Sequence, residues 1–462
     1  MPKLPDRNSC VTCRRRKVKC DGQKPKCANC GKSGRFCERP KENLKFVIHS
    51  ADATHAEKDA NMQSHLLHNL LLRANEELNR DALERVYELA SGPPRQALRV
   101  PDIARLFTHY INVLAPWYDL NDMAQSFGRV IPVMALDNII LFKALIAVSA
   151  IHLNKTTGLA VGYAPAFHAA CVRELLLSME ERVLEPEGGS LAATCLLRTF
   201  EIMNCDSRQD QRHLLGAYSF VVNDYTDMAT RGLFQAGAWN YLREEITVAL
   251  ECRRKVRISN SFNFQWRDDL DDDMQANAIA LTLAKVINFA FDNEASSPSA
   301  SSPESIPEHV DENDRITTWA HLINEVREWK KNLPASFEPY STAPKPGNMF
   351  PSLWMAKSHH IAAQQYWSCC EVLLSLANPL PGAEPDLGCA ESHALRVCGL
   401  ACSNENMAAT VNSFGMLAFC GRFLTQPYHR RALEDALTSF NMTTAWPVTS
   451  IMQDLKEHWT YK

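Results

Sequence analysis

Six cysteines lie close together near the start of the chain, in the segment CVTCRRRKVKCDGQKPKCANCGKSGRFC, and nine Lys or Arg residues are interleaved with them. The cysteines form two triplets with the same internal spacing of two and six residues: Cys10, Cys13 and Cys20, followed by Cys27, Cys30 and Cys37. Two thiolates separated by two residues can turn onto one metal ion. The repeat therefore predicts a zinc site built from two equivalent halves.

Counting bonds predicts how the six thiolates are shared. Three thiolates in each half leave a tetrahedral zinc ion one ligand short, whereas six sulfurs supply two ions with four bonds each when two sulfurs bridge. The bridging pair should occupy equivalent positions in the repeat, so we predict that Cys10 and Cys27 bridge two zinc ions. A disulfide knot is the alternative, but the opening MPKLPDRNSC has no apolar stretch that would direct secretion into an oxidising compartment.

This segment resembles the DNA-binding domain of fungal Zn2Cys6 binuclear-cluster transcription factors at every cysteine spacing. The similarity extends to CRRRKVKCD between the second and third cysteines and to Pro25, two residues before the fourth cysteine. The resemblance implies two zinc ions per chain, bridging thiolates at Cys10 and Cys27, and double-stranded DNA as the partner.

The basic residues after Cys13 are the candidate DNA contacts. Lys and Arg attract a duplex through counterion release, and they can also donate to the O6 and N7 acceptors of guanine in the major groove. By resemblance, Arg16 and Lys17 take the positions that read bases over a CGG triplet, and Arg14 and Lys19 meet phosphates. The same run of charges is a candidate nuclear-import signal, which predicts a nuclear protein.

The charge distribution agrees with a basic DNA-binding module attached to an acidic body. The first fifty residues hold fourteen Lys or Arg against four Asp or Glu, whereas the whole chain of 462 residues has a net charge of -4. Fifty residues cannot bury enough apolar surface to fold alone, so we expect metal binding to drive folding of this module. The rest of the chain is long enough to bury a large core.

We divide the chain into a Zn2Cys6 DNA-binding domain at 1–40, a linker at 41–60, a helical connector at 61–97 and an all-α domain at 98–462. The connector is rich in leucine, and GPP at 92–94 should end its helix. Part of it fits a coiled-coil seam: Leu67, Leu71, Ala74 and Leu78. Asp81 interrupts that seam, so coiled-coil homodimerisation and a helix packed on the body both stay open.

The body is expected to be all-α because its apolar residues recur at spacings of three and four. The longest apolar run, Ile139 to Ile151, contains Lys143 and is thirteen residues long, which suits a buried helix better than a membrane span. The segments HYINVLAPWYDLNDMAQSFGRVIP, NIILFKALIAVSAIHL and RGLFQAGAWNYLREEITVAL resemble the fungal-specific transcription factor regulatory domain. The group resembled includes regulators of the arginine-catabolism type, and the similarity covers roughly residues 98 to 460.

Two features of the body invite sharper hypotheses. The acidic run from Arg267 to Met274 could hold a cation, but we favour a solvated helix start, because carboxylates stabilise the first turn of a helix. The pair His359 and His360 has no neighbouring Cys or carboxylate pattern in the sequence, so we expect a structural role rather than metal binding.

The end of the sequence should be part of the folded body. Four apolar residues fall on one face of a closing helix: Val448, Ile451, Leu455 and Trp459. We therefore expect no separable acidic activation tail. Regulation would then come from the helical body, or from co-regulators and transcription machinery that it recruits.

The sequence favours a nuclear, sequence-specific regulator of RNA polymerase II genes that recognises CGG-type triplets and controls a metabolic or secondary-metabolite pathway. The alternative is an all-α enzyme or metabolite-binding protein that carries the zinc module as a DNA anchor. After residue 50 the sequence has no HExxH, GxSxG, phosphate-loop or GxGxxG motif. We therefore predict that the protein is not an enzyme, with zinc as its cofactor and without a membrane partner.

Overall fold

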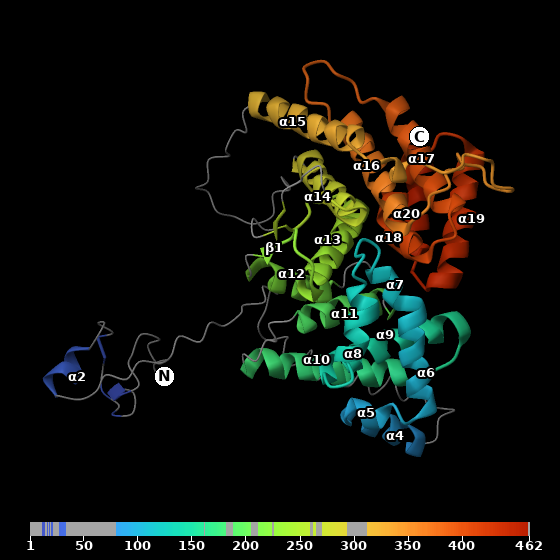
Figure 1. The fold of residues 1–462 in the computed structure, drawn as a ribbon. Coiled ribbons are helices and arrows are strands. Elements are labelled where there is room, and N and C mark those ends of the chain that lie inside the picture. Colours follow the sequence, from blue (N-terminus) through green and yellow to red (C-terminus); the bar gives the residue numbers. More distant parts are fainter. Residues whose placement is uncertain are drawn as a thin grey trace. The chain divides into compact units, whose positions relative to one another are not determined.

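The computed structural model describes residues 12–13, 16, 18, 20–21, 27–33, 80–160, 162–181, 188–204, 211–223, 226–258, 262–264, 270–292 and 312–460. The chain forms two compact units, Met1–His68 and Asn69–Lys462. The first unit contains the short helix α2 (Ala28–Lys32), and the second contains the helical body (Figure 1). The predicted linker 41–60 and the four seam positions from Leu67 to Leu78 lie outside the described residues.

The body begins with a series of short helical elements: α4 (Arg80–Ser91), α5 (Pro94–Ala97), α6 (Pro101–His109), the π-helical turn η1 (Tyr110–Leu114), α7 (Ala115–Tyr118), the π-helical turn η2 (Ser126–Val130) and α8 (Ile131–Met134). The predicted stop at GPP is confirmed, since α4 ends at Ser91 and Pro94 opens α5. Proline suits this first helical position because its missing N–H would have no partner within the helix.

Helix α9 (Ile139–Thr157) is the apolar run identified in the sequence. It packs against α10 (Tyr163–Glu181) and α11 (Gly189–Asn204). The Asn138 side chain caps its N-terminus by accepting hydrogen bonds from the backbone N–H groups of Ile140 and Leu141. Lys143 is buried and donates to Glu174 Oε1 of α10 at 2.9 Å, so its charge is paired within the body.

Among the helices in the described part of the chain, α9 alone is long and apolar enough to cross a membrane, and 67% of its most apolar window is buried inside the body. Burial on this scale fits the core helix that the sequence predicts.

The middle of the body contains α12 (Arg212–Asn223), α13 (Leu233–Cys252) and α14 (Asp272–Ala290). Two very short strands, β1 (Thr226–Asp227) and β2 (Phe262–Asn263), pair in parallel. This ladder is too small to form a layer of its own, and the body is all-α as predicted.

The C-terminal part of the body is built from the following elements: α15 (Glu312–Lys331), the 3-10 turn η4 (Ala335–Phe337), α16 (Ser358–Leu376), α17 (Leu387–Ser403), α18 (Met407–Cys420), the 3-10 turn η5 (Gly421–Phe423), α19 (Pro427–Thr444) and α20 (Thr449–Thr460). The predicted apolar face of the last helix is confirmed, because Ile451, Leu455 and Trp459 of α20 are all buried.

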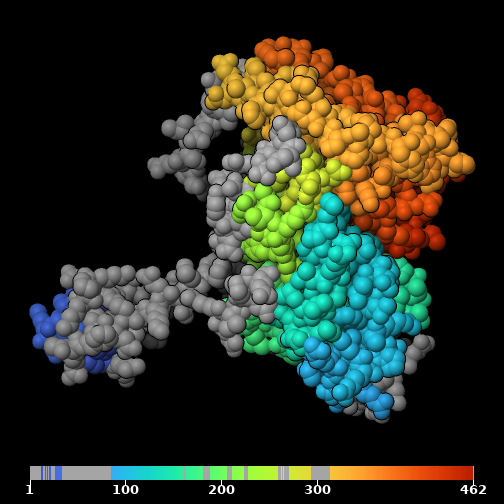
Figure 2. All heavy atoms as spheres, in the orientation of Figure 1, coloured from blue at the N-terminus to red at the C-terminus, as the bar shows by residue number. Residues whose placement is uncertain are grey.

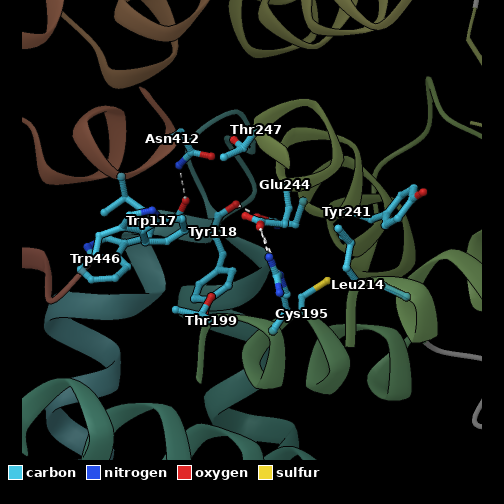
Figure 3. Close-up of a pocket in the computed structure, with 14 residues that line it drawn as sticks. Trp117, Tyr118, Cys195, Thr199, Leu214, Tyr241, Glu244, Thr247, Asn412 and Trp446 are labelled. Carbon is cyan, nitrogen blue, oxygen red and sulfur yellow. Dashed lines mark hydrogen bonds and ion pairs between the residues drawn. The ribbon is translucent and has the colours of Figure 1, made fainter. Parts of the chain in front are cut away.

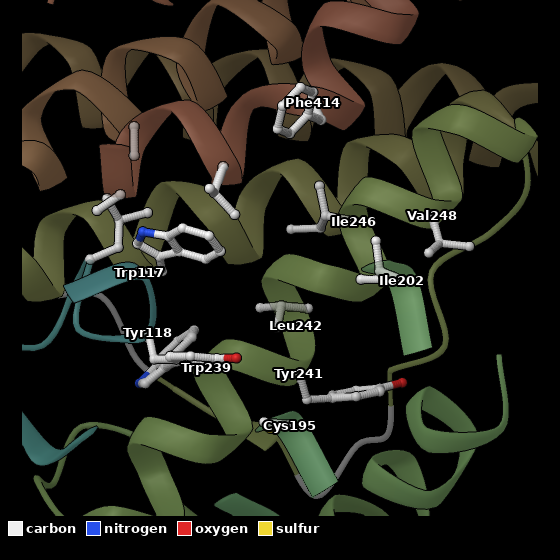
Figure 4. Close-up of a cluster of buried hydrophobic side chains, with 14 of the residues drawn as sticks. Trp117, Tyr118, Cys195, Ile202, Trp239, Tyr241, Leu242, Ile246, Val248 and Phe414 are labelled. Carbon is white, nitrogen blue, oxygen red and sulfur yellow. The ribbon is translucent and has the colours of Figure 1, made fainter. Parts of the chain in front are cut away.

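The N-terminal and C-terminal helices of the body share one core. Helix α18 contacts both α7 and α13, and in Figure 2 the cyan surface of the N-terminal helices adjoins the orange and red surface of the C-terminal ones. Figure 4 shows Trp117 of α7, Leu242 of α13 and Phe414 of α18 in the same apolar cluster. Gly415 permits this close packing, since a Cβ there would lie 2.6 Å from Thr247 Cα.

Candidate zinc centre and DNA-contacting segment

The first cysteine triplet is placed by a helical turn. The backbone N–H of Arg16 donates to Thr12 O at 3.3 Å, and that of Val18 donates to Cys13 O at 3.1 Å. These hydrogen bonds wind the chain directly after Cys13, where the sequence predicts a short basic helix. Cys13 and Cys20 are buried, whereas Arg16 and Val18 are exposed. Thiols therefore face inward and at least one predicted DNA contact faces solvent.

The second triplet opens helix α2. Cys27 is its N-cap residue, and the Cys27 thiol accepts a hydrogen bond from the backbone N–H of Cys30 at 3.4 Å. The Asp21 carboxylate accepts from the backbone N–H of Ala28 at 3.1 and 3.2 Å. Asp21 follows the third cysteine directly, so it ties the first half of the module to the first turn of α2. Sequence reasoning did not assign this role to Asp21.

The sulfur atoms gather as a metal site requires. Cys13 Sγ lies 3.6 Å from Cys27 Sγ and 3.9 Å from Cys30 Sγ. The ligand atoms of Cys13, Cys20 and Cys27 all lie within 4.8 Å of one another. Zinc–sulfur bonds of about 2.3 Å in a tetrahedron separate two sulfurs by roughly 3.8 Å, so these thiols fit shared zinc ligation. A disulfide would hold two sulfurs about 2.05 Å apart.

Cys27 belongs to the group that includes Cys13 and Cys20 from the first triplet, and it also contacts Cys30 of its own triplet. The structure thus brings together four of the six predicted ligands. Cys10 and Cys37 lie outside the described residues.

Of the predicted DNA contacts, the structure describes Arg16. Its guanidinium donates to Ser33 Oγ at 3.4 Å, and Ser33 Oγ donates to Asn29 O at 2.7 Å. This contact orients Arg16 from the end of α2, a connection that the sequence pattern did not reveal. Three other predicted contacts lie outside the described residues: Arg14, Lys17 and Lys19.

The acidic run differs in part from its predicted solvated helix start. Asp271 is the N-cap residue of α14 and is largely exposed, as expected. Asp273, however, is only 1% exposed. It pairs with Arg231, whose Nη1 lies 2.5 Å from Asp273 Oδ2, and it accepts from the backbone N–H of Met123 at 3.0 Å. A buried carboxylate loses its contacts with water, so it needs charged or hydrogen-bonding partners such as these.

The two adjacent histidines also have a partner that the sequence did not indicate. His360 Nε2 lies 2.8 Å from Asp272 Oδ2, and the ligand atoms of Asp272, His359 and His360 lie within 4.8 Å of one another. This carboxylate is 88 positions away in the sequence, so no local pattern could indicate it. All three residues stand in the first turns of α14 and α16, whose N-terminal dipoles disfavour a cation. The contact joins the two helices, in keeping with a structural role.

Comparisons with protein families agree with this geometry. Residues 8–45 match the family model of the fungal Zn(2)-Cys(6) binuclear cluster domain. Residues 105–231 match that of the fungal specific transcription factor domain. Comparison with curated proteins and with solved structures finds no match.

The module is thus a zinc-cluster DNA-binding domain that binds two zinc ions, and the helical body carries a regulatory domain. The chain contains a fungal Zn(2)-Cys(6) binuclear cluster domain and a fungal specific transcription factor domain, and together these make it a DNA-binding transcription regulator; neither family is a family of enzymes. Membership of the arginine-catabolism group stays a prediction.

Proposed function

We propose that the protein is a nuclear regulator of RNA polymerase II genes and that it selects its sites through CGG triplets. The observation that carries this proposal is the inward gathering of Cys13, Cys20 and Cys27 beside an exposed Arg16. Such a module holds a basic turn rigidly on a metal-bound core, so its side chains can be presented to a major groove. Base contacts of this kind are what convert charge attraction into sequence preference.

Within that module we assign base reading to Arg16 and Lys17, and phosphate contacts to Arg14 and Lys19. The contact of Arg16 with Ser33 supports the assignment, because a guanidinium held from a second helix loses less freedom on binding DNA.

We assign all six cysteines as zinc ligands, with Cys10 and Cys27 shared between the two ions. Cys27 lies beside two thiols of the first triplet and caps the helix that carries Cys30, and this position supports its part in the scheme. The two ions supply folding free energy to a segment that is too small to fold on an apolar core.

The body, taken as residues 98–462 after a linker at 41–60 and a connector at 61–97, would control what the bound module does. It is acidic and helical, which suits contacts with co-regulators or with a second copy of the chain rather than with DNA. The controlled genes would belong to a metabolic or secondary-metabolite pathway.

Selection from randomised duplexes tests this proposal without assuming a site. The full-length, zinc-loaded protein is incubated with a random duplex library at near-physiological salt, and the bound fraction is sequenced over several rounds. CGG triplets, single or paired, should become enriched, and EDTA should abolish the enrichment. Enrichment of motifs without CGG would refute the triplet assignment, while chelator-resistant binding would refute zinc-dependent recognition.

A further inference from the structure

The helical body contains a cavity where its N-terminal and C-terminal helices meet (Figure 3). The cavity has a volume of about 50 Å³, which admits a compact group of a few heavy atoms. Its wall is contributed by α7, α11, α12, α13, α18 and the segment before α20. A molecule bound there would touch helices from both ends of the body at once.

Two oxygen atoms at this cavity are available as hydrogen-bond acceptors. Glu244 Oε1 accepts from Arg198 Nε at 3.2 Å and from Arg198 Nη2 at 3.1 Å. Asn412 uses its Nδ2 group to donate to Trp117 O and Ala408 O. Among the described residues, Glu244 Oε2 and Asn412 Oδ1 have no hydrogen-bond partner.

Glu244 and Asn412 both line the cavity, and each is a partly exposed residue in an otherwise buried stretch. Glu244 stands in a run of buried residues on α13, and Asn412 stands in a run of buried residues on α18. The Glu244 side chain is 17% exposed, while its neighbours Arg243 and Glu245 are buried.

The Trp117 side chain forms part of the cavity wall. Its indole Nε1 has almost no exposed surface, toward the cavity or elsewhere, so we assign that nitrogen no contact with a ligand. The two acceptors therefore define the chemistry of the cavity. Figure 3 shows Trp117, Glu244 and Asn412 around the same space.

The aromatic part of the wall is held firmly. Trp446 stacks on Phe414 with ring centroids 5.3 Å apart. Trp117 packs edge-on against His152 at 5.2 Å. Indole faces attract cations, and the attraction is stronger when water is excluded.

We propose that this cavity binds a small molecule with a primary ammonium group, which donates to Glu244 Oε2 and Asn412 Oδ1. Two acceptor oxygens favour a ligand that donates hydrogen bonds, and the carboxylate favours a cationic donor. Burial raises the pKa of the Glu244 carboxyl above its ordinary value despite the adjacent Arg198. A bound ammonium group would stabilise the ionised carboxylate. The proposal does not depend on the assignment of the DNA contacts.

A set of three probes of similar size tests the ligand class on the full-length protein. The probe 2-aminoethanol carries both the ammonium and the oxygen, ethylamine lacks the oxygen, and ethylene glycol lacks the charge. Each is titrated at constant ionic strength while the indole N–H resonances are followed by NMR, with the Trp117 signal assigned from its loss in Trp117→Phe. We expect saturable binding of 2-aminoethanol and of ethylamine, each with a shift of the Trp117 signal because the indole lies in the cavity wall, and no binding of ethylene glycol. Equal responses to all three probes, or no saturation by 2-aminoethanol, would overturn the proposal and leave a cavity that holds only water.

Substitutions locate the site. Glu244→Gln removes the charge and should weaken 2-aminoethanol binding at least tenfold, and Asn412→Leu removes the second acceptor at similar volume and should weaken it several-fold. Glu384→Gln alters an exposed carboxylate in a loop away from the cavity and should leave binding unchanged. Circular dichroism checks that each variant is folded. If Glu244→Gln does not fold, the Asn412→Leu variant tests the site instead. Wild-type affinity in a folded Glu244→Gln or Asn412→Leu variant would refute the assignment.

Discussion

Single substitutions of cysteine should show whether Cys27 serves both zinc ions. In the structure Cys27 lies within 4.8 Å of Cys13 and Cys20 and caps the helix that carries Cys30. If it bridges, Cys27→Ala leaves each ion with three of its four sulfurs, whereas Cys20→Ala takes one sulfur from one ion only. We therefore expect two zinc ions per chain in the wild type, about one in Cys20→Ala and fewer than one in Cys27→Ala.

The assay is zinc analysis of full-length protein after dialysis against a weak chelator under reducing conditions. Cys252→Ala supplies the matched control, because Cys252 is an exposed cysteine of the body and its removal should leave both ions in place. Equal zinc content in Cys20→Ala and Cys27→Ala would refute the shared thiolate. One zinc ion per wild-type chain at saturation would refute the two-ion site itself.

The body supplies further tests. Glu245 is fully buried and is paired with Arg254, so Glu245→Leu should lower the free energy of unfolding by about 3–5 kcal/mol in urea titrations, and a loss below about 1 kcal/mol would contradict the pairing. Burial and the nearby His213 lower the pKa of His168 to about 3, so between pH 6.5 and 3 the unfolded chain binds a proton that the folded chain does not. As the pH falls from 6.5 to 3, His168 should lower the free energy of unfolding by at most about 1.4 kcal/mol per pH unit. The His168→Phe variant should show a smaller dependence of that free energy on pH, and an unchanged dependence would show that His168 is not the cause. Residues 1–60 should bind DNA but leave reporter transcription unchanged, and full regulation by that fragment would show that the body is dispensable.

The zinc site could be predicted because the cysteines that form it lie close together in the sequence. Ligand spacing along a short segment determines which thiols can reach one ion, and charge interleaved with those thiols indicates a polyanion as the partner. The all-α class of the body was predictable for a similar reason, since apolar residues at helical spacing and the capped, largely apolar α9 reflect short-range geometry. The glycine and prolines at 92–94 predicted the end of α4 from backbone chemistry alone, because proline lacks the N–H group that a helix interior needs.

The remaining contacts depend on residues far apart in the chain. Asp272 meets His360 across 88 positions, and Asp273 meets Arg231 across 42, so neither pair has a signal in a local pattern. The acidic run therefore looked solvated although one of its carboxylates is buried. The cavity is lined by residues from several helices, with Trp117, Glu244 and Asn412 on three different ones, so only tertiary packing could reveal it.

The most direct test of the account compares base reading with charge attraction in the basic turn. Binding of full-length wild type, Lys17→Ala and Arg14→Ala is measured on a CGG-containing duplex and on an unrelated duplex, each at two salt concentrations. If Lys17 reads guanine, Lys17→Ala should cost about 1–3 kcal/mol on the CGG duplex and far less on the other. Arg14→Ala, as a phosphate contact, should weaken both duplexes about equally and reduce the salt dependence by roughly one charge. Equal losses on the two duplexes for Lys17→Ala would contradict sequence reading at this position.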